Sequence, residues 1–388
     1  MERVCSIFSQ IMRFIPRGMF EEAVQRHGAE KHAKGMTCWS QFIALLFCQL
    51  SGARSLREIT GGLAASEGKL KHLGVPRAPT RSTLAYANQH RPWQVFRDVF
   101  DGLVKVCQGE AAARKRKFRF KGPLLSLDAT IIPLCLSMFD WALYRQQKGA
   151  AKVHVVMDNA SGLPQFAVIT HGKTGDITAA RKMNFAPGAM LVFDRGYEAH
   201  SWWRQLAAGG VRFVSRLKDS TNYEVVEVRP ASPNRTVLRD EVILLASEPD
   251  HAQGMRLRRV EIWVEEKQGT LAFVTNDLKL AATTIAAIYK DRWAIELLFK
   301  ALKQSMRIKT FIGTSENAVQ AQIWTALIAM LVVRFLQLRS TWKWSLSNLV
   351  ALLRQQLFVY RDLWVWLNQP FQPPIPLDDP QLMLPGLG

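Results

Sequence analysis

Apolar residues recur every three to four positions through the first 110 residues, which is the spacing of amphipathic helices. The segment "TCWSQFIALLFCQLSG" shows this spacing clearly, and Gly52 is predicted to end its helix. The next segment, "SLREITGGLAAS", begins with Ser55 and places Glu58 three residues later, as in a capping box. The pattern therefore predicts a helical domain. Helix, Pro/Gly-rich turn and helix also fit a DNA-reading helix-turn-helix, and an ordinary helical bundle fits equally well.

From residue 122 the chain changes to short apolar runs bounded by Gly, Pro, Asp and Asn, which are typical of strands. Two helical segments separate the later runs. The pattern predicts three successive strands followed by strand–helix units in a mixed sheet. The five runs are "GPLLSLDATIIPL", "KVHVVMD", "FAVITHG", "MLVFDRGY" and "VRFVSRLKD".

Residues 220–280 alternate apolar and polar positions, which predicts an antiparallel β insertion. Helical spacing then returns. The apolar run "WTALIAMLVV", residues 324–333, is too short to cross a bilayer and is predicted to be a buried helix. The pattern divides the chain into a helical domain (1–115), a sheet (116–219), a β insertion (220–282), a helical return to the core (283–345), and a C-terminal helix with a Pro-rich tail (346–388).

The chain of 388 residues has a formal net charge of +19 and a pI of about 10.0. Such an excess of Lys and Arg predicts a polyanionic partner, with nucleic acid favoured over an anionic membrane. The five cysteines are scattered and form no Cys-x-x-Cys pair, which argues against a disulfide framework and a structural zinc site. The N-terminus lacks the apolar core of a signal peptide, so a soluble cytoplasmic protein is expected.

A basic run, "RKRKFRFK" at 114–121, lies where the helical domain meets the sheet. Six of its eight residues are Lys or Arg, and two Phe residues stand between them. Runs of this kind at domain junctions bind phosphates or serve as solvated linkers, and the sequence does not choose between the two.

Two aspartates occur where a charge is costly. Asp128 lies inside the apolar run "LLSLDATII", and Asp194 ends the run "MLVFDRGY" at a Gly-containing turn. A carboxylate in a buried strand needs a partner charge or a metal ion. Each could also be a turn cap or the partner of a nearby Arg.

A third carboxylate, Glu296, lies in "IYKDRWAIELLFKALK", residues 288–303, which is predicted to be one helix. At about 100° per residue five of its polar side chains fall in one narrow strip of roughly 80°, and the helix is apolar over most of its remaining circumference. We therefore expect the strip to face a cleft, with a solvated salt-bridge face as the alternative. The strip consists of Tyr289, Arg292, Glu296, Lys300 and Lys303.

Three carboxylates in a basic protein are the oxygen-only ligand set that Mg²⁺ prefers. Two such ions about 4 Å apart activate an attacking hydroxyl and stabilise the leaving oxygen of a phosphodiester. The chain contains no P-loop, no H-E-x-x-H and no G-x-S-x-G, so nucleotide hydrolysis, zinc proteolysis and esterase chemistry gain no support.

The spacing of Tyr289, Arg292, Glu296 and Lys303 matches Y-x-x-R-x-x-x-E-x-x-x-x-x-x-K without a gap. In this the chain resembles bacterial DDE transposases of the insertion-sequence family four group, which carry the YREK signature. The order of the other motifs agrees over about residues 120–340. The resemblance implies an α/β, ribonuclease H-like mixed sheet interrupted by an antiparallel β insertion, preceded by a helical domain for DNA-end recognition and followed by a C-terminal helical region.

The resemblance also implies roles for particular residues. Asp128, Asp194 and Glu296 would be the catalytic triad and the ligands of Mg²⁺, with Mn²⁺ as an alternative and two ions expected. Gly196 departs from the family, in which Glu is common at this position. Trp263 and Trp293 are the candidates for stacking on a flipped base. The DNA-contacting residues would be Tyr289, Arg292, Lys300, Lys303, Arg195, Arg216 and Lys218.

The implied activity is cut-and-paste transposition on double-stranded DNA. The protein would bind terminal inverted repeats, cleave DNA with a metal, and transfer the freed strand to target DNA. A homodimer on DNA and a cytoplasmic, nucleoid-associated location follow from the same resemblance, with no membrane partner. A DNA-binding protein without catalysis and a sequence-specific nuclease are the alternatives.

Overall fold

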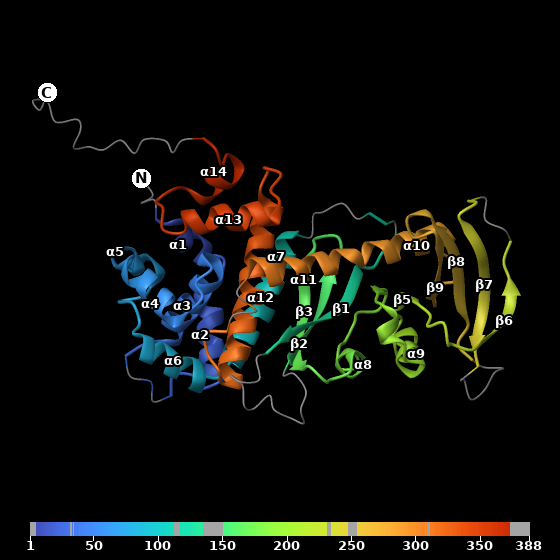
Figure 1. Ribbon diagram of the computed structural model, residues 1–388, viewed down its shortest axis with the longest axis horizontal. Helices are drawn as coiled ribbons and strands as arrows, with labels where there is room; N and C mark the ends of the chain where they lie inside the picture. The colour runs from blue at the N-terminus through green and yellow to red at the C-terminus, as the bar shows by residue number, and fades with distance from the viewer. Residues whose placement is uncertain are drawn as a thin grey trace, which may run out of the picture.

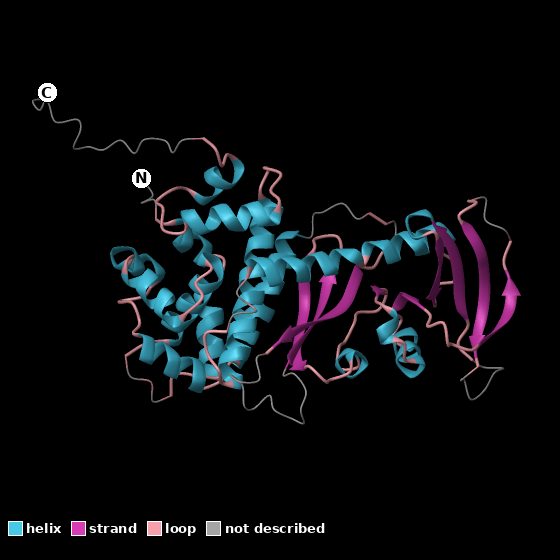
Figure 2. Cartoon of the chain, in the orientation of Figure 1, coloured by secondary structure: helices cyan, strands magenta, loops and turns pink. Residues whose placement is uncertain are grey.

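The computed structural model gathers helices at one end of an elongated molecule and strands at the other (Figures 1 and 2). It describes residues 5–31, 33, 35–111, 117–118, 120–134, 150–230, 234–246, 254–306, 308 and 311–372.

The N-terminal region is helical, as predicted. Gly52 ends a helix in the left-handed conformation at φ 79°, and Ser55 caps the next helix through the backbone N–H of Glu58. The expected turn of a helix-turn-helix is longer than the sequence indicated, because α4 and α6 are separated by a short helix, a 3₁₀ turn and a loop. The helices are α1 (Ile7–Met12), α2 (Arg17–Arg26), α3 (Cys38–Ser51), α4 (Leu56–Ala64), α5 (Glu67–Leu70), α6 (Arg81–His90) and α7 (Gln94–Ala111).

Among the described residues, nine strands form one sheet in the order β3-β2-β1-β4-β5-β9-β8-β7-β6. The first three form an antiparallel meander, and β4 and β5 continue it in parallel with β1. This arrangement confirms the ribonuclease H-like mixed sheet. Its strands are β1 (Leu124–Pro133), β2 (Ala150–Asp158), β3 (Leu163–His171), β4 (Met190–Val192) and β5 (Arg212–Arg216).

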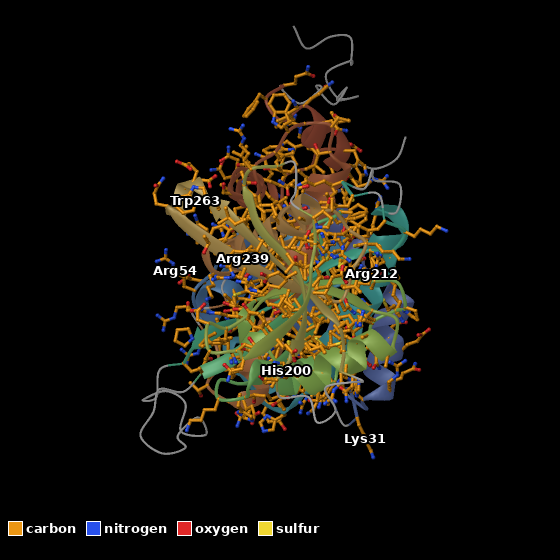
Figure 3. The ribbon with its side chains drawn as sticks, turned by 90° about the vertical axis from the view of Figure 1, so that its right-hand side faces the viewer. Lys31, Arg54, His200, Arg212, Arg239 and Trp263 are labelled. Carbon is orange, nitrogen blue, oxygen red and sulfur yellow. The ribbon has the colours of Figure 1, made fainter. Side chains whose placement is uncertain are left out.

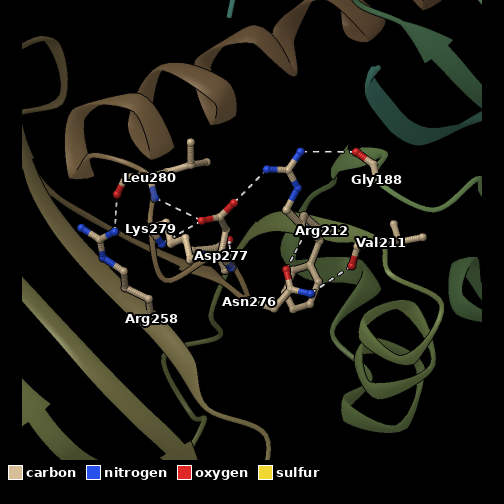
Figure 4. Close-up of polar contacts among 10 residues, drawn as sticks. Gly188, Val211, Arg212, Arg258, Asn276, Asp277, Lys279 and Leu280 are labelled. Atoms are coloured by element: carbon tan, nitrogen blue, oxygen red, sulfur yellow. Dashed lines mark hydrogen bonds and ion pairs between the residues drawn. The ribbon is translucent and has the colours of Figure 1, made fainter. Parts of the chain in front are cut away.

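The predicted β insertion is antiparallel and extends the same sheet through the pairing of β9 with β5. Arginine side chains stabilise the junction between the insertion and the core sheet. Asp277, just past β9, accepts a bond of 3.1 Å from Arg212 on β5, and Arg258 on β8 donates to the carbonyl of Leu280 (Figure 4). Arg258 also pairs with Asp240 at 2.6 Å, with both side chains nearly buried. The strands are β6 (Tyr223–Val228), β7 (Val237–Leu245), β8 (Leu257–Val264) and β9 (Gly269–Thr275).

The two faces of the sheet carry different helices (Figure 2). On one face lie α8 (Asp176–Ala180) and α9 (His200–Ala208), whose apolar residues pack in one cluster with Leu127, Val156 and Phe213. On the other lie α10 (Ala282–Asp291) and α11 (Trp293–Ser305), and α11 contacts β1. The second face is where the candidate site forms.

A long helix, α12 (Glu316–Arg339), connects the two ends of the molecule. It contacts α3, α6 and α7 in the helical region and β3 in the sheet. It has the length and hydropathy of a membrane span, but 89% of its most apolar window is buried inside the protein, so the prediction of a buried helix at 324–333 is confirmed. The last helices, α13 (Leu346–Gln356) and α14 (Leu363–Asn368), share a core with the first ones. The Pro-rich tail from residue 373 lies outside the described residues.

Candidate active site

Asp128 lies in the middle of β1, opposite Val155 of β2. Its side chain is 18% exposed, and one carboxylate oxygen accepts the backbone N–H of Ala129 at 2.8 Å. The prediction of a carboxylate inside an apolar strand is confirmed. Its backbone is held by pairing with β2, and β4 pairs with β1 just before it, at residues 124–126.

Asp194 follows β4, the parallel neighbour of β1. Its side chain caps a 3₁₀ turn, Arg195–Tyr197, by accepting the N–H of Gly196 at 2.9 Å. A Cβ atom at position 196 would stand 2.9 Å from the Asp194 carboxylate oxygen, closer than side chains tolerate. In this turn, glycine at the position where the family commonly has Glu therefore leaves room for the carboxylate.

The segment 288–303 is not one helix, and that prediction is wrong. It divides at Arg292 into α10 and α11, because the amide of Arg292 bonds to Tyr289 and the amide of Ile295 bonds to Arg292, each only three residues back. Trp293 is 58% exposed and Leu297 is 51% exposed, so solvent reaches a side of α11 that the sequence analysis took to be buried. Arg292 and Glu296 nevertheless remain on one side.

Arg292 bridges two of the three carboxylates. Its guanidinium lies 2.5 Å from Glu296 Oε1 and 3.3 Å from Asp128 Oδ2, with only 13% of the side chain exposed. Burial disfavours the charge, but Tyr289, Glu296 and Asp128 together raise the pKa of Arg292, so it stays charged. The bridge joins β1 to α11 across 164 residues of sequence.

The third carboxylate belongs to the same neighbourhood. The pKa of Asp128 is raised to about 6, chiefly by burial and also by the negative charges of Asp194 and Glu296. The hydrogen bond from the Ala129 N–H and the positive charge of Arg292 act in the opposite direction. Among the described residues, no group of three Asp, Glu, His or Cys side chains is arranged so that it could hold a metal ion as it stands. The carboxylates lie near one another, two of them with a cation between them. This oxygen-only, anionic donor set fits a divalent ion.

Tyr289 and Arg216 lie beside this cluster. Burial raises the pKa of the Tyr289 hydroxyl, opposed by the positive charges of Arg292 and Arg216. The Tyr289 ring packs against Phe273 of β9 with centroids 5.0 Å apart, and the Arg292 guanidinium lies 5.4 Å from its centroid. Arg216 ends β5. These residues form one wall from α10, β5 and β9.

The other predicted DNA contacts are placed less tightly. Lys300 on α11 is exposed, and Lys303 lies one turn later and is half-buried. Arg195 is 52% exposed and lies 3.5 Å from Asp219. Lys218 is exposed in the loop after β5, where its backbone N–H bonds to Glu198.

The two candidate stacking residues differ in setting. Trp293 begins α11, one residue from Arg292. Trp263 lies on β8, is 38% exposed, and donates its indole N–H to Glu265 at 2.8 Å. In Figure 3 Trp263 and Arg239 project to the same side of the view as Arg54 of the helical domain, and Arg212 lies on the opposite side. No contact between Trp263 and Asp128, Asp194 or Glu296 is present among the described residues.

The sequence analysis missed several supporting residues. Tyr197 is buried, and burial together with the negative charges of Asp176, Asp128 and Asp194 raises the pKa of its hydroxyl. Glu198 accepts bonds from Lys218 and Thr221 and so holds the loop after β5. The one available signal was the unbroken "DRGYE", in which a further acid and an aromatic follow the second aspartate.

Part of the basic run has a structural partner. Lys117 forms an ion pair of 2.6 Å with Asp291, the residue before Arg292, and the Asp291 carbonyl accepts a bond from Asn159. Phe118 and Phe120 stack with centroids 5.8 Å apart. Residues 114–116 and 119 lie outside the described residues. Thus at least one cation of the run anchors the end of α10.

Comparison with known proteins agrees with this geometry. The transposase DDE domain family matches residues 119–332, and a domain family of unknown function matches residues 4–76. A putative transposase of Sinorhizobium fredii, y4zB, is 34% identical over 295 residues, 74% of this chain and 80% of that protein. A probable transposase for the insertion sequence element IS5377 of Geobacillus stearothermophilus is 28% identical, covering 68% of each chain. Among solved structures, a piggyBac transposase synaptic complex with hairpin DNA gives a TM-score of 0.46 at 10% identity, covering 90% of this chain and 79% of that one.

The family match spans more than half of the chain and contains β1, the turn after β4 and α11, the three elements that carry the carboxylates. DDE transposases act on DNA with divalent metal ions. By the extent of this match and by its identity to y4zB, the chain belongs to the DDE transposase family, whose members catalyse DNA cleavage and strand transfer.

Proposed function

We propose that this transposase binds the terminal inverted repeats of its element, cleaves DNA at the element's ends, and joins the freed 3′ ends to target DNA in a cut-and-paste reaction. The proximity of Asp128, Asp194 and Glu296, with Arg292 between two of them, carries the proposal. The cations fit a substrate whose backbone is a chain of negative charges.

Asp128, Asp194 and Glu296 are proposed to be the ligands of two Mg²⁺ ions, for which Mn²⁺ can substitute. When bound, such ions activate the attacking water or 3′-hydroxyl and stabilise the leaving oxygen. The protein supplies fixed geometry, since Asp128 sits on a central strand and Asp194 is clamped by its own turn.

The surrounding cations are proposed to hold DNA phosphates. Trp263 and Trp293, both exposed, are proposed to stack on unpaired bases near the cut site. The phosphate contacts are proposed for Tyr289, Arg292, Lys300, Lys303, Arg195, Arg216 and Lys218.

The helical domain is proposed to recognise the DNA ends, with α6 in contact with the duplex. Between residues 38 and 91 the chain carries seven Lys and Arg residues against two Glu. Leu84 and Ala87 bury one side of α6. On its exposed side Tyr86 is 66% exposed and stacks on the ring of His90 at 4.0 Å. The outward positions of α6, all but one of them polar, are Arg81, Ser82, Thr83, Ala85, Tyr86, Gln89 and His90.

Two element ends must be held together for transposition, so we propose a homodimer on DNA. A cytoplasmic location in association with the nucleoid is proposed from the same requirement for chromosomal DNA.

The proposal is tested by a plasmid excision and integration assay with the element's own ends, comparing the wild type with Glu296→Gln. The variant is expected to lose cleavage and retain DNA binding, because the amide has the same shape and cannot serve as an anionic ligand. Full activity of Glu296→Gln with Mg²⁺ would refute the proposed site. Cleavage without integration by the wild type would identify a nuclease, and binding without cleavage would identify a DNA-binding protein that lacks catalysis.

A further inference from the structure

Arg292 occupies the space between two proposed metal ligands. Its terminal nitrogens reach Asp128 at 3.3 Å and Glu296 at 2.5 Å. A cation that contacts both carboxylates does electrostatically what a bound metal ion would do. The two carboxylates therefore compete for Arg292 with the DNA phosphate that it is proposed to contact.

The arrangement leaves Arg292 incompletely satisfied. Its Nε–H group is buried and finds no hydrogen-bond partner among the residues that the structure describes. A guanidinium offers five N–H donors, and its planar fork matches a phosphate as well as a carboxylate. A phosphate oxygen near Tyr289 would therefore compete for the same side chain.

The helical hydrogen bonding is also irregular at Arg292. Arg292 is the single residue between α10 and α11, where the four-residue helical bonding is interrupted. Asp291 on its N-terminal side is fixed by Lys117 and Asn159. The end of α10 is thus held beside the junction by contacts that do not involve the Arg292 side chain.

We propose that Arg292 is a placeholder for the catalytic metal: without DNA it neutralises Asp128 and Glu296 and opposes divalent-ion binding, and a bound DNA phosphate draws it away and opens the site. The inference rests on the proposed ligand role of Asp128 and Glu296. It assigns Arg292 as a positioning residue that couples metal binding to DNA binding. Coupling of this kind is reciprocal, so a divalent ion must also strengthen DNA binding.

The consequence is protection of the chromosome. A transposase that loads metal before it holds DNA can hydrolyse any phosphodiester that drifts into the site. If the positive charge of Arg292 leaves the carboxylates only when a phosphate replaces them, the ion is held tightly only in the DNA complex.

The test measures Mn²⁺ binding directly, from the electron paramagnetic resonance signal of free Mn²⁺, on the full-length protein without DNA. We expect Arg292→Gln to bind Mn²⁺ about tenfold more tightly than the wild type, a coupling in the usual range. Arg292→Lys keeps the charge and is expected to stay close to the wild type. Lys290→Gln removes an exposed charge two residues away and serves as the matched control, with little change expected.

Adding duplex DNA from the element's end is expected to tighten Mn²⁺ binding to the wild type by a similar factor and to leave Arg292→Gln nearly unchanged. Equal or weaker Mn²⁺ binding by Arg292→Gln without DNA would overturn the inference, as would equal tightening by Arg292→Lys. Failure of the proposed function gives a different result. If Glu296→Gln leaves Mn²⁺ binding unaltered, the carboxylates are not the ligands, whatever Arg292 does.

Discussion

Replacing Asp128 with Asn should stabilise the metal-free protein while it abolishes DNA cleavage. Burial raises the pKa of this carboxyl group to about 6, with the N–H of Ala129 and the charge of Arg292 opposing the shift. An ionised carboxylate in this setting is therefore a cost that the native fold tolerates for function. Asn keeps the shape and the hydrogen-bond acceptor without the charge.

The magnitude follows from the pKa. A rise from 3.8 to about 6 is about two units, and at 1.36 kcal/mol per unit the ionised form costs the fold ~3 kcal/mol. That cost already includes the attraction of Arg292, and Asn leaves Arg292 paired with Glu296 alone, so we expect a smaller net gain of ~1–2 kcal/mol at pH 7.5. The side chain is only 18% exposed, so solvent screening removes little of this.

The sign can be checked against pH. A raised carboxyl pKa means that the native state holds the proton more tightly than the unfolded state. The stability from this group is fully present below pH 4 and is lost as the pH rises from about 4 to about 6. The difference between Asp128→Asn and the wild type should therefore be largest above pH 6 and should shrink towards pH 4.

The assay is urea unfolding in the presence of a chelator at pH 7.5 and at pH 4.5, alongside plasmid cleavage. Asp101→Asn on α7 is the matched control, because burial likewise raises the pKa of Asp101 to about 6. It should stabilise the protein over the same pH range and leave cleavage intact. If Asp128→Asn is less stable than the wild type at pH 7.5 by more than ~1 kcal/mol, the pairing with Arg292 outweighs burial and the reasoning fails.

Two further predictions concern the β insertion and the helical domain. Arg258→Met should cost ~3–5 kcal/mol in urea unfolding because it strands the nearly buried Asp240, and Arg258→Met with Asp240→Leu should recover most of that loss; equal losses in the single and double variants would contradict this. Tyr86→Ala, at an exposed position, should leave the melting temperature unchanged and weaken binding of the element's end in a gel-shift assay, and unchanged binding would show that α6 does not touch the duplex.

Much of the sheet could be predicted because each strand leaves an apolar pattern within a short segment of the sequence. Short apolar runs bounded by Gly, Pro, Asp and Asn predicted β1 to β5, and a carboxylate inside one of these runs identified Asp128. Asp194 was found by the same cost argument at a Gly turn. The spacing of Arg292 and Glu296 likewise survives the break between α10 and α11, because the two residues still form an i,i+4 ion pair.

The break itself could not be predicted, since the residues around Arg292 all suit a helix. It occurs where residues distant in the sequence make contact. Lys117 forms an ion pair with Asp291, Asn159 donates to the Asp291 carbonyl, and Arg292 forms an ion pair with Asp128 of β1. The exposure of Leu297 could not be predicted either. The protein buries only one side of α11, and Leu297 lies outside that side. Patterns along the chain carry no information about such partners.

The packing of α12 connects the helix that is proposed to recognise DNA with the sheet that carries the carboxylates. Asn317, near the start of α12, donates to the carbonyls of Asn88 and Arg91 at the end of α6, and its side chain accepts the N–H of Trp93. The remainder of α12 packs against β3 and α11. The proposed recognition surface on α6 and the sheet that carries the carboxylates thus both contact one buried helix. Because that helix is apolar almost all round and lies in the core, it cannot bend without opening the core. Under the proposed function, this buried helix would set the distance from the recognised sequence to the cut phosphate, as cleavage at a fixed element end requires.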